Sequence, residues 1–360
     1  MAFFRKKDKK QSVWYMITHT GELDKEEYMK LVKGATWFVG LGFAASFAVF
    51  IIIAFIGGIG TVVRTILDSN LYIYLLAFLA VFLGILLRFG KWQYYLKTLE
   101  LKVPLKKNLI VYLSLYSMNI TPGMLGRVLV AYTISRLTDV KISSVVPIVT
   151  MDIFTDFMGT AVVAILAAIY FHQYVLYVLG LDILLIIPYA FILNDWFYRV
   201  IKRIFRNRRF LEMFTLYGDE YFASQSALNT PKTYAVSMAA TIPATVLSAM
   251  ALYFTLLATG IVPHVAGTIF IYTSAHIFGM ATAIPGNIGV TDGALVALLG
   301  STFHLSTGVA SAVTIMTRFA TLWFGISLGG VLLIYTFRYW GPSKRAAGMD
   351  EKGKRKRKTA

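Results

Sequence analysis

The most informative feature of the sequence is the length of its apolar runs. Between residues 37 and 336, apolar side chains gather in stretches of roughly 20 residues, where a soluble helix would show them only every three or four positions. About 20 apolar residues are what an α-helix needs to cross the roughly 30 Å of hydrocarbon in a bilayer. The pattern therefore predicts an all-α integral membrane protein.

Six stretches have the length of transmembrane helices, and two others are interrupted. The full spans are expected at about 37–59, 71–88, 145–170, 174–193, 233–259 and 308–336. The interrupted stretches, 109–137 and 266–300, contain Pro122-Gly123 and Pro285-Gly286, and both pairs break a helix. The 13 residues before the first break cover about 20 Å, which is too short to cross the bilayer.

Basic residues distinguish a kinked span at 109–137 from a re-entrant hairpin that enters and leaves on one side. Loops rich in Lys and Arg face the cytoplasm. One such loop carries Arg199, Lys202, Arg203, Arg206, Arg208 and Arg209. Counted from a cytoplasmic amino terminus, this loop is cytoplasmic only if 109–137 is a hairpin. The exit loop of 266–300 has no Lys or Arg, which favours a second hairpin entered from outside.

The two breaks share the pattern Pro-Gly-x-x-Gly, which ends at Gly126 in the first and at Gly289 in the second. Because one hairpin is expected to enter from inside and the other from outside, units 71–170 and 233–336 are expected to form an inverted-topology repeat, as in many alternating-access transporters. Around this membrane domain of residues 37–336 we expect a basic cytoplasmic arm, 1–36, and a basic cytoplasmic tail, 337–360. Both termini are then cytoplasmic.

Composition narrows the classes of partner. The formal net charge is +17, but the basic residues flank apolar runs, so we expect membrane lipids as partners, with anionic head groups at the basic loops and tail, and no nucleic acid. The chain has no cysteine and no His pair with metal-ligand spacing, so no metal or cofactor is expected. Gly325 and Gly329 indicate either a homodimer face or close packing within one chain.

Ionisable residues inside the spans are the candidate site. Asp152 and Asp156 share a helical face, and Asp156 and Arg318 lie 34 and 33 residues after Pro122 and Pro285. A charge near the bilayer centre costs about 2.5 to 3.5 kcal/mol, so these side chains should avoid lipid. One interpretation is that Asp156 pairs with Arg318, or each with a backbone amide, to hold the repeats together. The other, which is compatible with it, is that they line a path that binds a polar head group or relays protons. Asp292 is a candidate partner of Arg318.

His276 is expected to be a packed residue and not a ligand. The half-helices that follow each break are expected to aim backbone amides at a phosphate.

Arg88 is a basic residue at a span end that is followed by Trp92, and the segment 119–126 has the pattern Asn-x-x-Pro-Gly-x-x-Gly. Both motifs resemble those of the lysylphosphatidylglycerol synthase and flippase transmembrane-domain family. Arg127 stands where the family usually has Glu, and Val130 stands where Arg is frequent. In the segment 152–156, which is similar to Glu-Arg-x-x-Asp, Ile153 replaces the Arg.

The second half is the closer match. The segment 285–295 resembles Pro-Gly-Gly-x-Gly-x-x-Glu-Gly-Ala-Leu, and 318–323 matches Arg-x-x-Thr-x-Trp. The resemblance implies a stand-alone lipid flippase without the family's synthase domain, in the cytoplasmic membrane of a prokaryote. The implied substrate path contains Asn119, Arg127, Asp152, Asp156, Asn287, Asp292, Arg318 and Trp323.

We therefore expect a translocase for a polar-headed or anionic lipid or lipid carrier. A coupled transporter of a small soluble solute would use the same repeat. A lipid-modifying transferase would need clustered nucleophile, base or metal ligands; the sequence shows no such motif, so an enzyme is not expected. A scaffold or accessory subunit would lack a polar cavity between the hairpins.

Overall fold

The computed structural model covers most of the predicted membrane domain. The described residues are 25–121, 126–170, 176, 179–180, 182–183, 219–282 and 284–340. The Pro122-Gly123 break, most of the predicted span 174–193, the basic loop at 199–209 and most of both basic ends lie outside these residues.

Among the described residues every regular element is helical, and five helices are long and apolar enough to cross a membrane. They are Val39–Ile56 within α2 (Lys25–Ile56), α4 (Leu71–Thr98), α7 (Ile142–Tyr170), α12 (Pro231–Ala258) and Thr307–Thr336. The last consists of α15 (Thr307–Arg318), a π-helical turn η5 (Phe319–Trp323) and most of α16 (Phe324–Trp340). The prediction of an all-α membrane protein is confirmed.

The second span is longer than the sequence suggested. It was predicted to end at residue 88 with a basic loop after it, but α4 continues to Thr98 and carries Arg88 and Lys91 inside the helix. Asn70 begins the helix by accepting hydrogen bonds from the amides of Tyr72 and Ile73. The prediction failed because buried carboxylates neutralise the two cations. A hydropathy pattern does not take such ion pairing into account.

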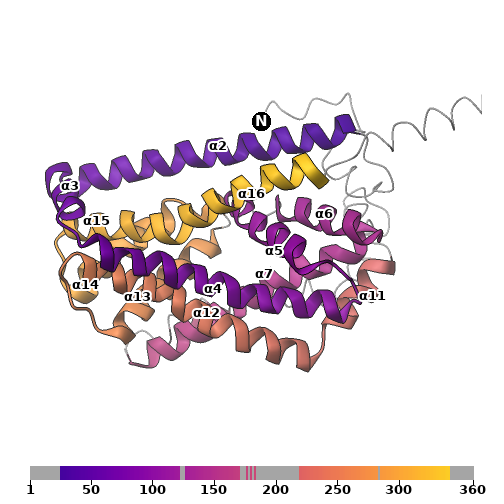
Figure 1. Ribbon diagram of the computed structural model, residues 1–360. Helices are drawn as coiled ribbons and strands as arrows, with labels where there is room; N and C mark the ends of the chain where they lie inside the picture. The colour runs from indigo at the N-terminus through magenta and orange to yellow at the C-terminus, as the bar shows by residue number, and fades with distance from the viewer. Residues whose placement is uncertain are drawn as a thin grey trace, which may run out of the picture.

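Each interrupted stretch forms two short helices around a break. The first contains α5 (Leu105–Ser114), the 3₁₀ turn η1 (Leu115–Ile120) and α6 (Val128–Thr138). The second contains α13 (Val265–Ala281), the 3₁₀ turn η4 (Pro285–Asn287) and α14 (Val290–Phe303). In each stretch the two arms lie side by side, where a kinked span would place them end to end, and the two stretches occupy opposite ends of the long helices (Figure 1). We refer to them as the first and second hairpin.

The tips of the two hairpins meet inside the bundle. Turns η1 and η4 are in contact, and a Cβ on Gly286 would lie 3.6 Å from Ile120 Cγ1. Ile120 and Ile288 share one buried apolar cluster with Phe50, Trp323 and Ile326. The described end of the first hairpin, η1, therefore packs against the break of the second hairpin at η4.

Two glycines of the last helix allow the first hairpin to pack closely against it. A Cβ on Gly329 would lie 2.6 Å from the Ser117 amide nitrogen and 2.7 Å from the Leu113 carbonyl oxygen, and one on Gly325 would lie 3.3 Å from the Tyr116 ring. Backbone cannot move aside as a side chain can, so only glycine fits at 329. Of the two interpretations of the Gly-x-x-x-Gly step, the structure shows close packing within one chain.

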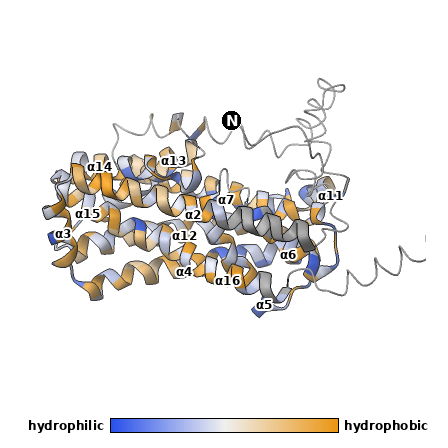
Figure 2. Cartoon of the chain, turned by 90° about the horizontal axis from the view of Figure 1, so that it is seen from above, coloured by the Kyte–Doolittle hydropathy of each residue, from blue (hydrophilic) through white to orange (hydrophobic). Residues whose placement is uncertain are grey.

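The outward faces of the long helices are apolar. Phe55 is 75% exposed, and Leu41, Phe47, Leu75 and Leu79 are exposed as well. Figure 2 shows hydrophobic residues along the lengths of the helices. Such continuous exposed apolar surface is typical of a lipid-facing exterior, which agrees with a multi-pass membrane protein.

Candidate functional site

A polar cavity of about 140 Å³ lies beside the hairpin tips. Its polar lining residues are Arg88, Tyr116, Asn119, Arg127, Asp156, Thr160, Ser248, Tyr272, His276, Asn287, Arg318 and Thr321, together with the backbone of Gly286. They come from α4, α7, α12, α15, η5 and both hairpins. At the roughly 30 Å³ that one water occupies in the liquid, the cavity could hold about five waters. It is smaller than the roughly 300 Å³ at which pockets for drug-sized ligands begin.

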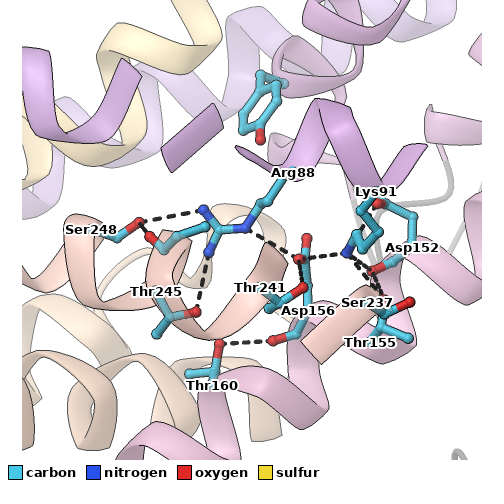
Figure 3. A network of polar contacts seen from close by, with 12 residues as sticks. Arg88, Lys91, Asp152, Thr155, Asp156, Thr160, Ser237, Thr241, Thr245 and Ser248 are labelled. Atoms are coloured by element: carbon cyan, nitrogen blue, oxygen red, sulfur yellow. Dashed lines mark hydrogen bonds and ion pairs between the residues drawn. The ribbon is translucent and has the colours of Figure 1, made fainter. Parts of the chain in front are cut away.

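Lys91 is the centre of a buried ionic network (Figure 3). Its side chain is fully buried, and its Nζ lies 2.8 Å from Asp156 Oδ1 and 3.1 Å from Asp152 Oδ1. It also donates to Thr155 Oγ1 at 3.0 Å. Because one ammonium contacts both carboxylates, Asp152 and Asp156 share a face of α7, as their four-residue spacing predicted.

Arg88 joins three long helices at the cavity wall. Its Nε donates to Asp156 Oδ1 at 3.1 Å, and Nη2 donates to Thr245 Oγ1 of α12 at 3.3 Å. Nη1 lies 3.5 Å from Ser248 Oγ, at the limit of a hydrogen bond (Figure 3). The suggested pair between Asp156 and Arg318 is thus wrong, because Arg88 and Lys91 occupy this carboxylate from α4.

Arg127 ties both arms of the first hairpin to α7. Its Nε and Nη2 donate to Asn119 Oδ1 on the opposite arm at 3.0 and 2.8 Å. Its Nη1 lies 3.1 Å from Asp152 Oδ2. A planar guanidinium can make these bonds at once because its N–H groups fan out in fixed directions.

Arg318 has the corresponding position in the second half. Its Nε lies 2.8 Å from Asp292 Oδ1, and Nη2 donates to the Gly286 carbonyl at 2.8 Å. The predicted partnership of Asp292 with Arg318 is confirmed. Gly286 can present its carbonyl there because its φ is 62°, in the left-handed region that favours glycine.

Asp292 also caps the helix that it begins. Its Oδ2 accepts a hydrogen bond from the Gly289 amide at 2.7 Å, which satisfies one of the donors left free at the start of α14. The expectation that half-helix amides point at a phosphate is therefore wrong for the Gly289 amide, because Asp292 binds it. The start of the other half-helix at 122–125 lies outside the described residues.

The structure sorts the predicted path residues into three groups. Asn119, Arg127, Asp156, Asn287 and Arg318 line the cavity, whereas Asp152 and Asp292 lie behind it and hold arginines.

Trp323 is placed elsewhere. Its Nε1 donates to Ser46 Oγ at 3.1 Å, and its ring packs edge-on against Phe43 of α2. The predicted break residue Gly126 belongs to none of these three groups. A Cβ there would lie 2.7 Å from Met118 Sδ, so the absence of a side chain at Gly126 allows the arms of the first hairpin to approach closely.

Several residues of the site were missed from the sequence. Lys91 lies beyond the predicted end of the second span at residue 88, although its position three residues after Arg88 puts both cations on one helical face. Tyr272 and His276 also line the cavity, their rings stacked with an interplanar angle of 8°. His276 is packed, as predicted, but it also faces the cavity. Its spacing of four from Tyr272 in an otherwise apolar helix was the available signal.

The ionic residues of the site have an excess of positive charge. Among the described residues, the cations Arg88, Lys91, Arg127 and Arg318 meet the carboxylates Asp152, Asp156 and Asp292. Four cations and three carboxylates leave one positive charge. In the low dielectric of a protein interior such a charge is costly unless an anion accompanies it.

Comparison with known protein families gives an independent result. The family model described as the lysylphosphatidylglycerol synthase TM region matches residues 37–329. No curated protein sequence gives a significant match to the chain. The match covers all five long helices and both hairpins except the last part of α16, and the family fits a function that concerns membrane lipids. The chain therefore belongs to the lysylphosphatidylglycerol synthase transmembrane-region family.

Proposed function

We propose that this protein translocates a polar-headed lipid across the membrane by alternating access. The observation that carries the proposal is the place of the cavity. It lies where the hairpins from opposite ends of the bundle meet, and it presents three guanidinium groups within an otherwise apolar helix bundle.

The energetic cost of this arrangement supports a functional role. Each charged side chain near the bilayer centre costs about 2.5 to 3.5 kcal/mol on insertion scales, and such residues usually mark substrate or ion pathways. A purely structural core would be as stable or more stable with well-packed apolar side chains. The protein instead keeps seven charged residues around one small cavity.

In the proposed cycle each hairpin closes the cavity from its own side of the membrane. Helix α13, with 17 residues, spans about 25 Å, and α14 with 14 residues spans about 21 Å. Neither crosses 30 Å of hydrocarbon, so the second hairpin would be re-entrant. The first would be re-entrant from the other side, since its helices α5 and α6 have only 10 and 11 residues. Outward movement of one hairpin would open the cavity to one leaflet while the other keeps it shut.

The size of the cavity fits a head group and excludes the acyl chains. The phosphate of a head group is comparable in size to the roughly five waters that 140 Å³ can hold. The acyl chains would then stay in the bilayer beside the bundle. Guanidinium groups bind phosphate oxygens through charge-assisted, often bidentate hydrogen bonds, so the arginines would hold the head group during its passage.

The test uses the full chain reconstituted in liposomes with a lipid labelled on one acyl chain. Transbilayer movement is measured as the label becomes accessible to an impermeant quencher. Arg318→Ala and Asp156→Asn, checked for folding by size-exclusion chromatography, are expected to lower the rate at least about tenfold, the effect of losing one buried charged contact. Arg136→Ala is the matched control, because this exposed arginine lies on α6 outside the cavity. Unchanged rates in both folded variants would refute the proposal.

A further inference from the structure

The chemistry of the cavity lining carries a more specific inference, which rests on the proposed lipid translocation. We propose that the cavity selects head groups with a net negative charge, and that Arg127 determines this selectivity. The support comes from the hydrogen-bond donors that face the cavity, from the charges around it and from the pairing of Arg127.

Unpaired donors dominate the lining. A guanidinium has five N–H groups and no acceptor. Among the described residues, Arg88 and Arg127 each use three of these groups and Arg318 uses two. Each arginine therefore keeps at least two N–H groups without a described partner, and all three arginines line the cavity.

Charged acceptors are scarce on the same surface. Asp156 is the one carboxylate among the described residues that line the cavity, and its Oδ1 already receives Arg88 and Lys91. Asp152 and Asp292 lie behind their arginines. A phosphate offers only acceptor oxygens and matches this lining, whereas an ammonium offers only donors. An ammonium group would meet three guanidiniums and one carboxylate whose Oδ1 already contacts two cations.

The net charge of the buried ionic network also favours an anionic head group. Its excess of one positive charge is cancelled by a head group of charge −1, remains with a zwitterion and grows to +2 with a cationic head group. Two unit charges about 4 Å apart at an effective dielectric constant of about 20 interact by more than the free energy of a tenfold change in affinity. Each change of one unit in the charge of the head group should therefore change the rate of transport by about tenfold or more.

Arg127 contacts a carboxylate that already has a second cation. Asp292 pairs with Arg318, Asp156 contacts both Arg88 and Lys91, and Asp152 lies 3.1 Å from the Lys91 ammonium. Asp152 is therefore shared by Lys91 and by Arg127, which also lies 3.1 Å from it. Replacement of Arg127 by a neutral residue leaves three cations against three carboxylates, so the electrostatic preference for an anion should disappear.

The experiment compares three lipids with the same labelled acyl chain in proteoliposomes of the full chain. The probes are phosphatidylglycerol with charge −1, zwitterionic phosphatidylethanolamine, and ethylphosphatidylcholine, a phosphotriester with charge +1. The wild type should move them in that order, with steps of about tenfold. In Arg127→Gln the first two rates should agree within about twofold, since the network is then neutral.

Two variants separate charge from structure. Arg127→Lys keeps the charge and should keep the preference for phosphatidylglycerol, and Arg136→Gln, on the exposed side of the same helix, should behave as the wild type. A purely structural role of Arg127 would slow all three lipids by the same factor and leave their ratios unchanged, which would overturn the inference.

The remaining outcomes distinguish this inference from the function on which it rests. Equal wild-type rates for the three lipids would overturn charge selection while lipid translocation stands, as would loss of preference in a folded Arg127→Lys. If Arg127→Gln does not fold, charge selection is tested by the wild-type rates for the three lipids and by the preference of Arg127→Lys. Movement of none of the lipids would overturn the proposed function. Uptake of soluble glycerol phosphate without lipid movement would also overturn it, and would assign the anion site to a soluble solute.

Discussion

The buried pair of Asp292 and Arg318 allows a quantitative test of how the second hairpin is held. The two side chains are 0% and 5% exposed and 2.8 Å apart. Removing one partner of a buried ion pair costs about 3 to 5 kcal/mol, because the other charge stays buried without compensation. Asp292→Asn keeps the shape and an acceptor for the Gly289 amide. It should therefore lower the free energy of unfolding by about 3 to 5 kcal/mol through charge alone.

A double variant shows whether the unpaired charge is the cause. Asp292→Asn with Arg318→Gln removes both charges, so its loss should be smaller than the sum of the single losses by about 0.5 to 3 kcal/mol. Unfolding is followed by denaturant titration in detergent micelles. Asp68→Asn is the control, because this carboxylate is exposed and its change should cost less than about 0.5 kcal/mol.

The result that refutes this reasoning is a small effect of the single variant. If Asp292→Asn costs less than about 1 kcal/mol, Arg318 is not desolvated as the buried-pair argument requires. Water or an anion in the cavity would then stabilise the guanidinium. Additive losses in the double variant would likewise show that the two side chains act independently.

Three further variants, together with Gly330→Ala as the control for Gly329→Ala, test other contacts by the same titration. Gly329→Ala should cost about 1 to 3 kcal/mol, because its methyl group would overlap backbone of the first hairpin. Gly330→Ala, with no atom within 4 Å of its Cβ, should change stability by less than about 0.5 kcal/mol. Lys91→Met should cost about 3 to 5 kcal/mol, since two buried carboxylates lose their shared cation. Trp323→Phe should cost only about 0.5 to 1.5 kcal/mol, the value of its one hydrogen bond to Ser46.

The sequence predicted the helices well because the bilayer imposes their length. Five of the six expected spans correspond to helices of the described residues, and Pro285-Gly286 marks the observed break between α13 and α14. The carboxyl end of α4 was missed for a physical reason. Arg88 and Lys91 end the apolar run, but neutralisation by Asp152 and Asp156 lets the helix continue with both cations buried.

The pairing of charges was predicted correctly only between helices that follow one another along the chain, as α14 and α15 do. Asp292 and Arg318 belong to one repeat unit, and their pairing was predicted correctly. The suggested pair of Asp156 and Arg318 rested on equal distances from the two breaks. Equal distances identify corresponding positions in a repeat, and corresponding positions need not touch. The true partners of Asp156 come from α4, whose contact with α7 depends on helix packing that the sequence pattern does not specify.

The two hairpins are held by ion pairs of opposite polarity. In the first half the arginine is on the hairpin and the carboxylate on the span, as Arg127 and Asp152, 25 residues apart. In the second half the carboxylate is on the hairpin and the arginine on the span, as Asp292 and Arg318, 26 residues apart. In both halves the arginine faces the cavity and the carboxylate lies behind it.

This difference gives the hairpins unequal roles in the proposed cycle. Movement of the first hairpin would carry Arg127, and with it the excess positive charge, away from the cavity. Movement of the second would leave Arg318 on its span and withdraw the carboxylate that competes with a phosphate for it. An anionic head group would therefore be released when the first hairpin opens and held when the second opens. The direction of transport would then follow from the polarity of two ion pairs.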